Sequence, residues 1–212
     1  MDEIEIVEYD SEWPQRFELE AARVQAVLPP GLILAIEHFG STAIPGMSAK
    51  PIIDILITVT SVREARAAGV EPLESVGYAF WADNPRRDRL FFVKGLPPSA
   101  PRRTHHIHIL EQGREAQRVL LFRDYLRSNV HEADRYRALK CALAARYRSD
   151  REAYTAAKEE YIAEIVARSS SVGAYEHSAA RDLCCTQWRK EENDDRPHHS
   201  DCQRCRTFAG LL

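Results

Sequence analysis

The segment from Pro51 to Val59, PIIDILITV, is the strongest constraint on what this chain can fold into. It is almost entirely apolar and rich in β-branched residues, which is typical of a central strand buried on both faces of a sheet. Asp54 interrupts this run, and a buried carboxylate without a partner costs several kcal/mol. We therefore expect Asp54 to bind a ligand, to pair with a cation or to face a cleft.

Other segments show the periodicity of strands or helices on either side of this run. The predicted strands are residues 32–39, 78–81, 89–94 and 104–110, with a short edge strand over 4–9. A helix is predicted after Ser11, another from Ser61 to about Gly69, and three more after Gly113. This order predicts an α+β fold, in which a mixed β-sheet is followed by a C-terminal helical bundle.

Charge and hydropathy exclude several classes of protein. The 29 Lys and Arg residues are balanced by 32 Asp and Glu residues, and the net charge of −3 gives no global field for binding a nucleic-acid duplex. No apolar run approaches the ~20 residues of a membrane-spanning helix. The acidic N-terminus, MDEIE, does not resemble a signal peptide. We expect a soluble, cytoplasmic protein with no membrane partner.

The cysteines divide the chain at about residue 168. Only Cys141 lies in the first part, and the other four are Cys184, Cys185, Cys202 and Cys205. We predict one domain over residues 1–167 and a flexible tail over 168–212 that contains cysteine and histidine. In the tail, the C-x-x-C pair with His198 and His199 leaves a zinc knuckle open as an alternative to disorder.

The pair Gly40-Ser41 follows a predicted strand and precedes Asp54 on the next one. Small residues in a turn let main-chain N–H groups approach an anion, and the Ser41 hydroxyl adds a donor. The arrangement is similar to the phosphate turn and metal-binding carboxylate of nucleotidyltransferase-like folds. On spacing alone, a simple tight turn with Asp54 paired to Lys50 or to an arginine remains open.

Residues 40–55, GSTAIPGMSAKPIIDI, closely resemble the signature of the GrpB family. Further matches lie across about residues 4–167: VEYD with WP near the N-terminus, HIH at 106–108, FRDYLR at 122–127, Tyr136 with Lys140, and Tyr154 with Lys158. The resemblance implies a branch of the nucleotidyltransferase superfamily, found alone or fused to dephospho-coenzyme A kinase. Its fold would then be nucleotidyltransferase-like.

The resemblance also implies roles for individual residues. Gly40 and Ser41 would hold the phosphates of a nucleotide or another phosphorylated small molecule, and Asp54 would be the first metal-binding carboxylate. Thr42 and Lys50, in the same segment, would contribute to substrate binding. Active nucleotidyltransferases usually carry a second carboxylate two residues further on, where this chain has Leu56.

His106 and His108 occupy the region where a third acidic residue is expected. Their i, i+2 spacing places both on one face of a strand, and His105 on the other. With Asp54 on a neighbouring strand, they would form a site for Zn²⁺ or Mn²⁺. The alternative is that both histidines hydrogen-bond in a polar cleft or contact a ligand phosphate without a metal.

Charged residues on the three C-terminal helices are further candidates. Arg123, Asp124 and Lys140 would line the same cleft and bind a polyphosphate, or form ion pairs that hold helices together. Lys158 is a candidate for the same cleft, but an ion-pair network between helices or a solvent-exposed helix face is the favoured interpretation for it.

We therefore predict a nucleotidyltransferase-like protein that binds a nucleotide and a divalent metal, Mg²⁺, Mn²⁺ or Zn²⁺, at Gly40, Ser41 and Asp54. It would transfer a nucleotidyl group to an acceptor that the sequence does not identify. One alternative is a non-catalytic module that binds a nucleotide or another phosphorylated ligand. The other is a metal-dependent hydrolase that uses Asp54, His106 and His108.

Overall fold

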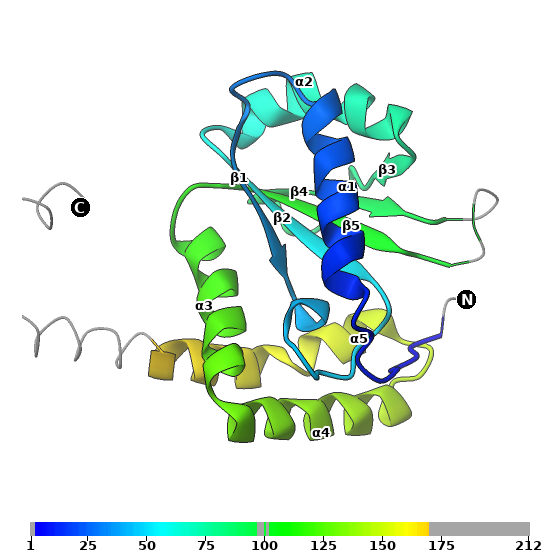
Figure 1. The fold of residues 1–212 in the computed structure, drawn as a ribbon, viewed down its shortest axis with the longest axis vertical. Coiled ribbons are helices and arrows are strands. Elements are labelled where there is room, and N and C mark those ends of the chain that lie inside the picture. Colours follow the sequence, from blue (N-terminus) through cyan, green and yellow to red (C-terminus); the bar gives the residue numbers. More distant parts are fainter. Residues whose placement is uncertain (1–2, 97–99, 101, 170–212) are drawn as a thin grey trace, which may run out of the picture. The chain divides into compact units, whose positions relative to one another are not determined.

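The computed structural model describes residues 3–96, 100 and 102–169 of the 212-residue chain. In this part of the chain, a five-stranded β-sheet packs with helices on both faces and beyond one end (Figure 1). The predicted cysteine- and histidine-containing tail lies outside the described residues.

The sheet has a mixed topology with a parallel pair at its centre. Its strands are β1 (Ile33–Phe39), β2 (Ile53–Val59), β3 (Tyr78–Phe80), β4 (Arg89–Lys94) and β5 (His105–Glu111). They lie in the order β1-β2-β5-β4-β3, with β2 parallel to β5 and every other pair antiparallel. The apolar run that contains Asp54 therefore forms a central strand.

One face of the sheet carries the larger hydrophobic core. Ile55, Ile57, Ile107 and Ile109 are 0% exposed on this face. They pack against α1 (Trp13–Val27) and α2 (Val62–Ser75), and α1 crosses the sheet in Figure 1. Because side chains alternate along a strand, Asp54 must lie on the opposite face, away from this core.

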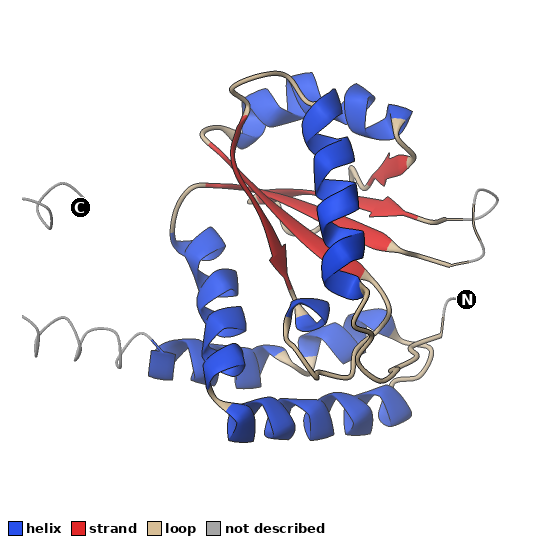
Figure 2. Ribbon diagram, in the orientation of Figure 1, coloured by secondary structure: helices blue, strands red, loops and turns tan. Residues whose placement is uncertain are grey.

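The opposite face is covered only in part. Leu56 and Leu110 pack there against Ala116 of α3 (Arg114–Ser128). The helices α4 (Val130–Arg146), α5 (Arg151–Ala156) and 159–169 lie beyond the end of the sheet where β1 ends and β2 begins (Figures 1 and 2).

A second hydrophobic cluster joins these helices to the β1–β2 connection. It contains Met47 from the connection, Phe122, Tyr136 and Ile165. The connection that carries the Gly-Ser turn is thus held between the sheet and the helical bundle. The predicted α+β class, with a mixed sheet followed by helices, is confirmed, and the nucleotidyltransferase-like fold stays a prediction.

Two predicted elements differ from the structure. The helix expected to end near Gly69 continues to Ser75; Gly69 is buried within it, and a Cβ there would lie 3.3 Å from the Leu28 side chain. The segment expected as an edge strand, residues 4–9, forms only the isolated bridge between Val7 and Ala49. No helix among the described residues has the length and apolarity to span a membrane.

A buried ion pair links α1 to the far strands of the sheet. The Glu20 side chain is 4% exposed, and its Oε1 accepts hydrogen bonds from Lys94 Nζ at 2.6 Å and from the Tyr78 hydroxyl at 3.0 Å. Burial opposes ionisation of Glu20, but the hydrogen bond and the charge of Lys94 outweigh it and lower the pKa of the carboxyl. Glu20 is therefore ionised in the folded protein and depends on Lys94.

We expect Lys94→Met to lower the free energy of unfolding at neutral pH by about 3 kcal/mol, because it leaves a buried carboxylate without its cation. The deficit shrinks as the pH falls towards the ordinary pKa of a carboxyl group, since Glu20 then takes up a proton. Urea unfolding measured at several pH values checks this. The double variant Glu20→Gln/Lys94→Met restores most of the stability; a deficit that does not change with pH would contradict the account.

Candidate functional site

The turn after β1 brings the main chain against a carboxylate. Gly40 has a φ of 73°, in the left-handed region that favours glycine, and Ser41–Ala43 follow as a short 3-10 helix. A Cβ added to Gly40 would lie 2.5 Å from Oδ2 of Asp54. Both the backbone conformation and the space available therefore require glycine at this position.

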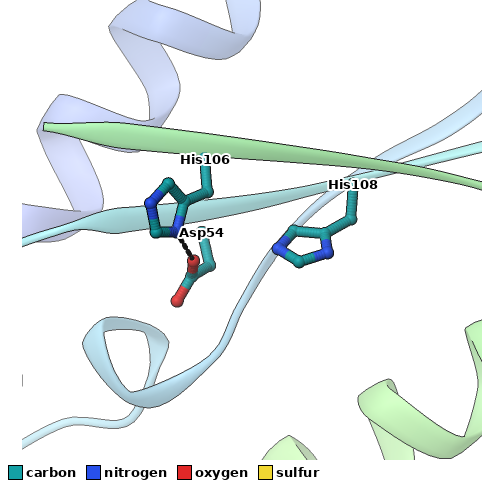
Figure 3. Close-up of side chains that lie close together, drawn as sticks. All are labelled: Asp54, His106 and His108. Atoms are coloured by element: carbon teal, nitrogen blue, oxygen red, sulfur yellow. Dashed lines mark hydrogen bonds and ion pairs between the residues drawn. The ribbon is translucent and has the colours of Figure 1, made fainter. Parts of the chain in front are cut away.

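Asp54 meets two histidines on the neighbouring strand. In the parallel pair of β2 and β5, Asp54 is opposite His106, so all three polar side chains project from one face. His106 Nδ1 lies 3.1 Å from Asp54 Oδ1 (Figure 3). One ligand atom from each of Asp54, His106 and His108 lies within 4.8 Å of the other two. The structure thus brings together the three residues predicted as metal ligands.

The electrostatic environment keeps Asp54 ionised and His108 neutral. Burial raises the pKa of Asp54, but the hydrogen bond with His106, the charge of His106 and the charge of Lys50 lower it further than burial raises it. Burial lowers the pKa of His108 to about 3, against the opposing charge of Asp54. An anionic carboxylate beside a neutral imidazole is the protonation state that metal binding requires.

The two histidines also have nitrogen atoms available for a ligand. His106 Nε2 and His108 Nδ1 are buried and have no hydrogen-bond partner among the described residues. A buried polar atom without a partner is rare and calls for an explanation. Two imidazoles and one carboxylate suit Zn²⁺ or Mn²⁺, whereas Mg²⁺ prefers oxygen ligands alone. The residues present therefore fit a transition metal.

Three lysines gather around two tyrosines of the helical bundle. Lys50 Nζ lies 5.0 Å and Lys158 Nζ 4.2 Å from the ring centre of Tyr154, and Lys140 Nζ lies 5.0 Å from that of Tyr136. Lys140 is 2% exposed and donates a hydrogen bond to the carbonyl oxygen of Ser48. Lys50 and Lys158, which are partly exposed, are the two members that can reach a ligand.

The positive charges of the lysine cluster, defined as Lys50, Lys140 and Lys158, repel one another. Burial, and then the charge of Lys158, lowers the pKa of Lys140 to about 7. Burial, and then the charge of Lys50, lowers the pKa of Lys158 to about 8, although the Asp54 carboxylate opposes this shift. A polyanion bound between these groups would relieve their repulsion. The Asp54 carboxylate is therefore close enough to Lys158 for the two charges to interact.

The two predicted substrate-binding residues after Gly40 have different surroundings. Burial raises the pKa of the Tyr136 phenol, and a hydrogen bond with Ser41 opposes that shift, which places Ser41 beside the lysine cluster. Thr42 is 1% exposed, with its Oγ1 3.0 Å from His38 Nε2 and 3.4 Å from the Ile52 carbonyl oxygen. The observed contacts of Thr42 stabilise the turn.

Arg123 and Asp124 form an ion-pair network at the start of the turn. The Arg123 guanidinium donates to both carboxylate oxygens of Asp124, to Glu37 at 2.7 Å and to the carbonyl oxygen of His38 at 2.8 Å. These contacts fasten α3 to β1, which corresponds to the helix-holding interpretation of the two residues. Arg127, one turn later, holds the 3-10 helix through the carbonyl oxygen of Ala43.

Sequence reasoning missed two contributors to the site. Lys158, expected on a solvent-exposed helix face, lies in the turn between α5 and helix 159–169 and packs over Tyr154. Phe91 of β4 packs against the rings of His106 and His108, with centroids 5.1 Å and 4.7 Å away. A lysine close in sequence to a buried tyrosine was the available signal for Lys158; nothing in the sequence marked Phe91.

A model of the family described as GrpB protein matches residues 3–168. The chain belongs to the GrpB family. A UPF0157 protein of Pseudomonas aeruginosa is 48% identical over 169 residues, which are 79% of this chain and 68% of that protein. A crystal structure of the conserved protein GrpB from Enterococcus faecalis superposes with a TM-score of 0.67 at 32% identity, over 78% of this chain and 96% of that one. The resemblance seen in the sequence is thereby confirmed.

One relative has a longer chain with a named activity. A protein of Mycolicibacterium paratuberculosis named dephospho-CoA kinase is 31% identical over 188 residues. The similarity spans 78% of this chain and 46% of that protein. More than half of the relative therefore lies outside the region aligned with this chain.

We expect Gly40→Ala to destabilise the protein by roughly 2 kcal/mol, because the new Cβ collides with Asp54 and the backbone conformation is strained. Gly31→Ala is the matched control: its φ is 79°, but no atom lies within 4 Å of the added Cβ. Urea unfolding of the two variants isolates the collision. In an Asp54→Ala background the cost of Gly40→Ala falls towards that of Gly31→Ala; equal costs in the wild-type background would contradict the predicted contact.

Proposed function

We propose that this GrpB-family protein is a metal-dependent nucleotidyltransferase-like protein. In this proposal, Asp54, His106 and His108 hold a divalent transition metal, and the lysine cluster with the Gly40-Ser41 turn binds the phosphates of a nucleotide. The observation that carries the proposal is a three-ligand cluster whose carboxylate, Asp54, also interacts electrostatically with Lys50 and Lys158 of the lysine cluster.

The charges match those of a metal–nucleotide complex. A nucleoside triphosphate carries about four negative charges near neutral pH, and a divalent metal neutralises part of them. Lys50 and Lys158 supply positive charge on the bundle side, and the buried Lys140 adds to it when it is protonated. Asp54 is one of the three candidate metal ligands, and its negative charge also raises the pKa of Lys158. Such preorganised charge is the main contribution that proteins make to phosphoryl-group transfer.

Each residue then has a distinct task. When bound, the metal would polarise a phosphoryl oxygen and offset the negative charge that develops on it. His106 and His108 pack against Phe91, and Asp54 orients the ring of His106 through the 3.1 Å contact. Gly40 lets the main chain of the turn approach the site, and Ser41 offers a hydroxyl donor towards the phosphates.

One observation favours a second candidate, in which the protein binds a phosphorylated ligand without nucleotidyl transfer. Leu56, where a second strand carboxylate is expected, is 0% exposed and packs against Leu110 and Ala116. An oxygen-ligated site with two metal ions therefore lacks a ligand here. The Asp-His-His set is compatible with a single-metal centre, which also supports hydrolysis of a phosphate ester.

Metal binding is tested directly with Mn²⁺ followed by electron paramagnetic resonance. We expect wild-type protein to bind Mn²⁺ and the variants Asp54→Ala and His106→Ala to lose at least 10-fold in affinity, since each removes a ligand. His105→Ala is the matched control, because its side chain projects from the other face of β5. Equal affinity in Asp54→Ala and wild type would exclude this site.

Nucleotide binding is expected to depend on pH through the lysine cluster. Binding of ATP requires the charged form of Lys140 and Lys158, whose pKa values are about 7 and about 8. The thermal stabilisation by ATP should therefore be greatest below about pH 7 and should decline as the pH rises through these values. Differential scanning fluorimetry across this pH range checks the prediction.

The control for the lysine cluster is a cation elsewhere on the bundle. Lys158→Gln should lose most of the stabilisation by ATP, whereas Arg146→Gln on the exposed surface of α4 should retain it. No stabilisation by ATP at any pH would overturn nucleotide binding.

Transfer and hydrolysis are distinguished by their products. With α-labelled ATP and Mn²⁺, a labelled product that Asp54→Ala does not form supports transfer, and labelled AMP alone supports hydrolysis.

A further inference from the structure

An open groove of about 620 Å³ lies at the other end of β5 from His106. Its walls are the start of α2, the segment between β3 and β4, the end of β5 and the start of α3. None of the three candidate metal ligands and no member of the lysine cluster lines it. A volume of this size is typical of small-molecule sites in proteins.

The groove is rich in guanidinium groups. Six arginines line it: Arg63, Arg66, Arg86, Arg87, Arg89 and Arg114. The acidic residues of the lining are Asp88, Glu111 and Glu115. The lining therefore carries an excess of positive charge, although the whole chain has a net charge of −3.

The acidic residues are already engaged. Arg89 is 7% exposed as a residue and binds Asp88 and Glu115 at 2.9 Å and 2.8 Å. Glu111 accepts a hydrogen bond from the main-chain N–H of Val62 at 3.0 Å. Arg86 is paired with Glu159 across to the last helix.

Four of the arginines that line the groove form no ion pair with a carboxylate of the described residues. Within the part of the chain that the structure describes, no carboxylate lies within ion-pair distance of Arg63, Arg66, Arg87 or Arg114. Arg66 stacks on the Phe80 ring, with 5.3 Å from its guanidinium carbon to the ring centre, and Arg87 donates to the carbonyl oxygen of Ala82. Four like charges around one groove are unfavourable unless an anion offsets them.

An exposed indole completes the groove. Trp81 is 43% exposed, which is uncommon for so large an apolar side chain and offers a flat surface for stacking. The centre of its ring lies 5.7 Å from that of Phe91, and Phe91 packs on both histidines of the candidate metal site. Successive ring contacts thus connect the groove to the histidines of the candidate metal site.

We propose that this groove is a second binding site, for a small phosphorylated molecule that carries a planar ring. Arg63 and Arg114 contact its phosphate, since a planar guanidinium group can donate two parallel hydrogen bonds to two oxygen atoms of one phosphate. Trp81 stacks on the ring. The site does not depend on nucleotidyl transfer at Asp54.

The experiment uses AMP as the probe and the fluorescence of Trp81 as the signal. AMP should quench the full-length wild-type protein in a saturable way, and Trp81→Phe should remove this change and leave the emission of the remaining tryptophans. Arg63→Ala/Arg114→Ala should weaken AMP binding at least 10-fold, which corresponds to about 1.4 kcal/mol. Both side chains are exposed, so the double variant should keep the wild-type melting temperature.

Two controls make the result specific. Arg135→Ala/Arg146→Ala removes the same charge from the surface of α4 and should leave AMP binding unchanged. Lys158→Gln should also leave it unchanged, which separates failure of this site from failure of the proposed nucleotide site. Equal weakening by the α4 control, equal quenching by adenosine, or quenching only by an oligonucleotide would each overturn a site for a small phosphorylated molecule.

Discussion

The ionised carboxylate of Asp54 is the constraint on which the site depends. It lies on a central strand, between the Gly40 main chain on one side and His106 on the other. A carboxylate in such surroundings stays charged only if hydrogen bonds and cations offset the cost of removing it from water. The neighbouring imidazoles and lysines serve that purpose, and in doing so they assemble the groups that a metal–phosphate complex requires.

The two faces of the sheet have different roles: one carries the larger hydrophobic core and the other carries the candidate site. One face is closed by α1 and α2 over isoleucines, with the Glu20–Lys94 pair as its buried ionic contact. The other face is covered by α3 only near Leu56 and Leu110, which leaves the polar residues of the same strands accessible from the helical bundle. Stability and chemistry therefore use alternate residues of the same two strands, β2 and β5.

Local sequence patterns were sufficient for the elements and for the identity of the central residues. The β-branched run around Asp54, the spacing of His106 and His108 and the family signature each point to the site without a structure. The order of the strands was not predictable in the same way, because pairing of β2 with β5 joins residues that are 52 positions apart. The surroundings of Lys158 were not predictable for a similar reason: only the packing of the helices shows that its Nζ lies over the ring of Tyr154.

The long separation between Asp54 and His106 has a consequence for how the protein folds. In the sequence, α2, β3 and β4 all lie between the paired strands β2 and β5. The three candidate ligands therefore come together only after β5 has paired with β2 across this long crossover connection. Contacts of high sequence separation form late and slowly, because the chain entropy of the loop must be overcome first. A metal ion at this site would therefore act on the finished sheet: it would slow unfolding and leave the rate of folding almost unchanged.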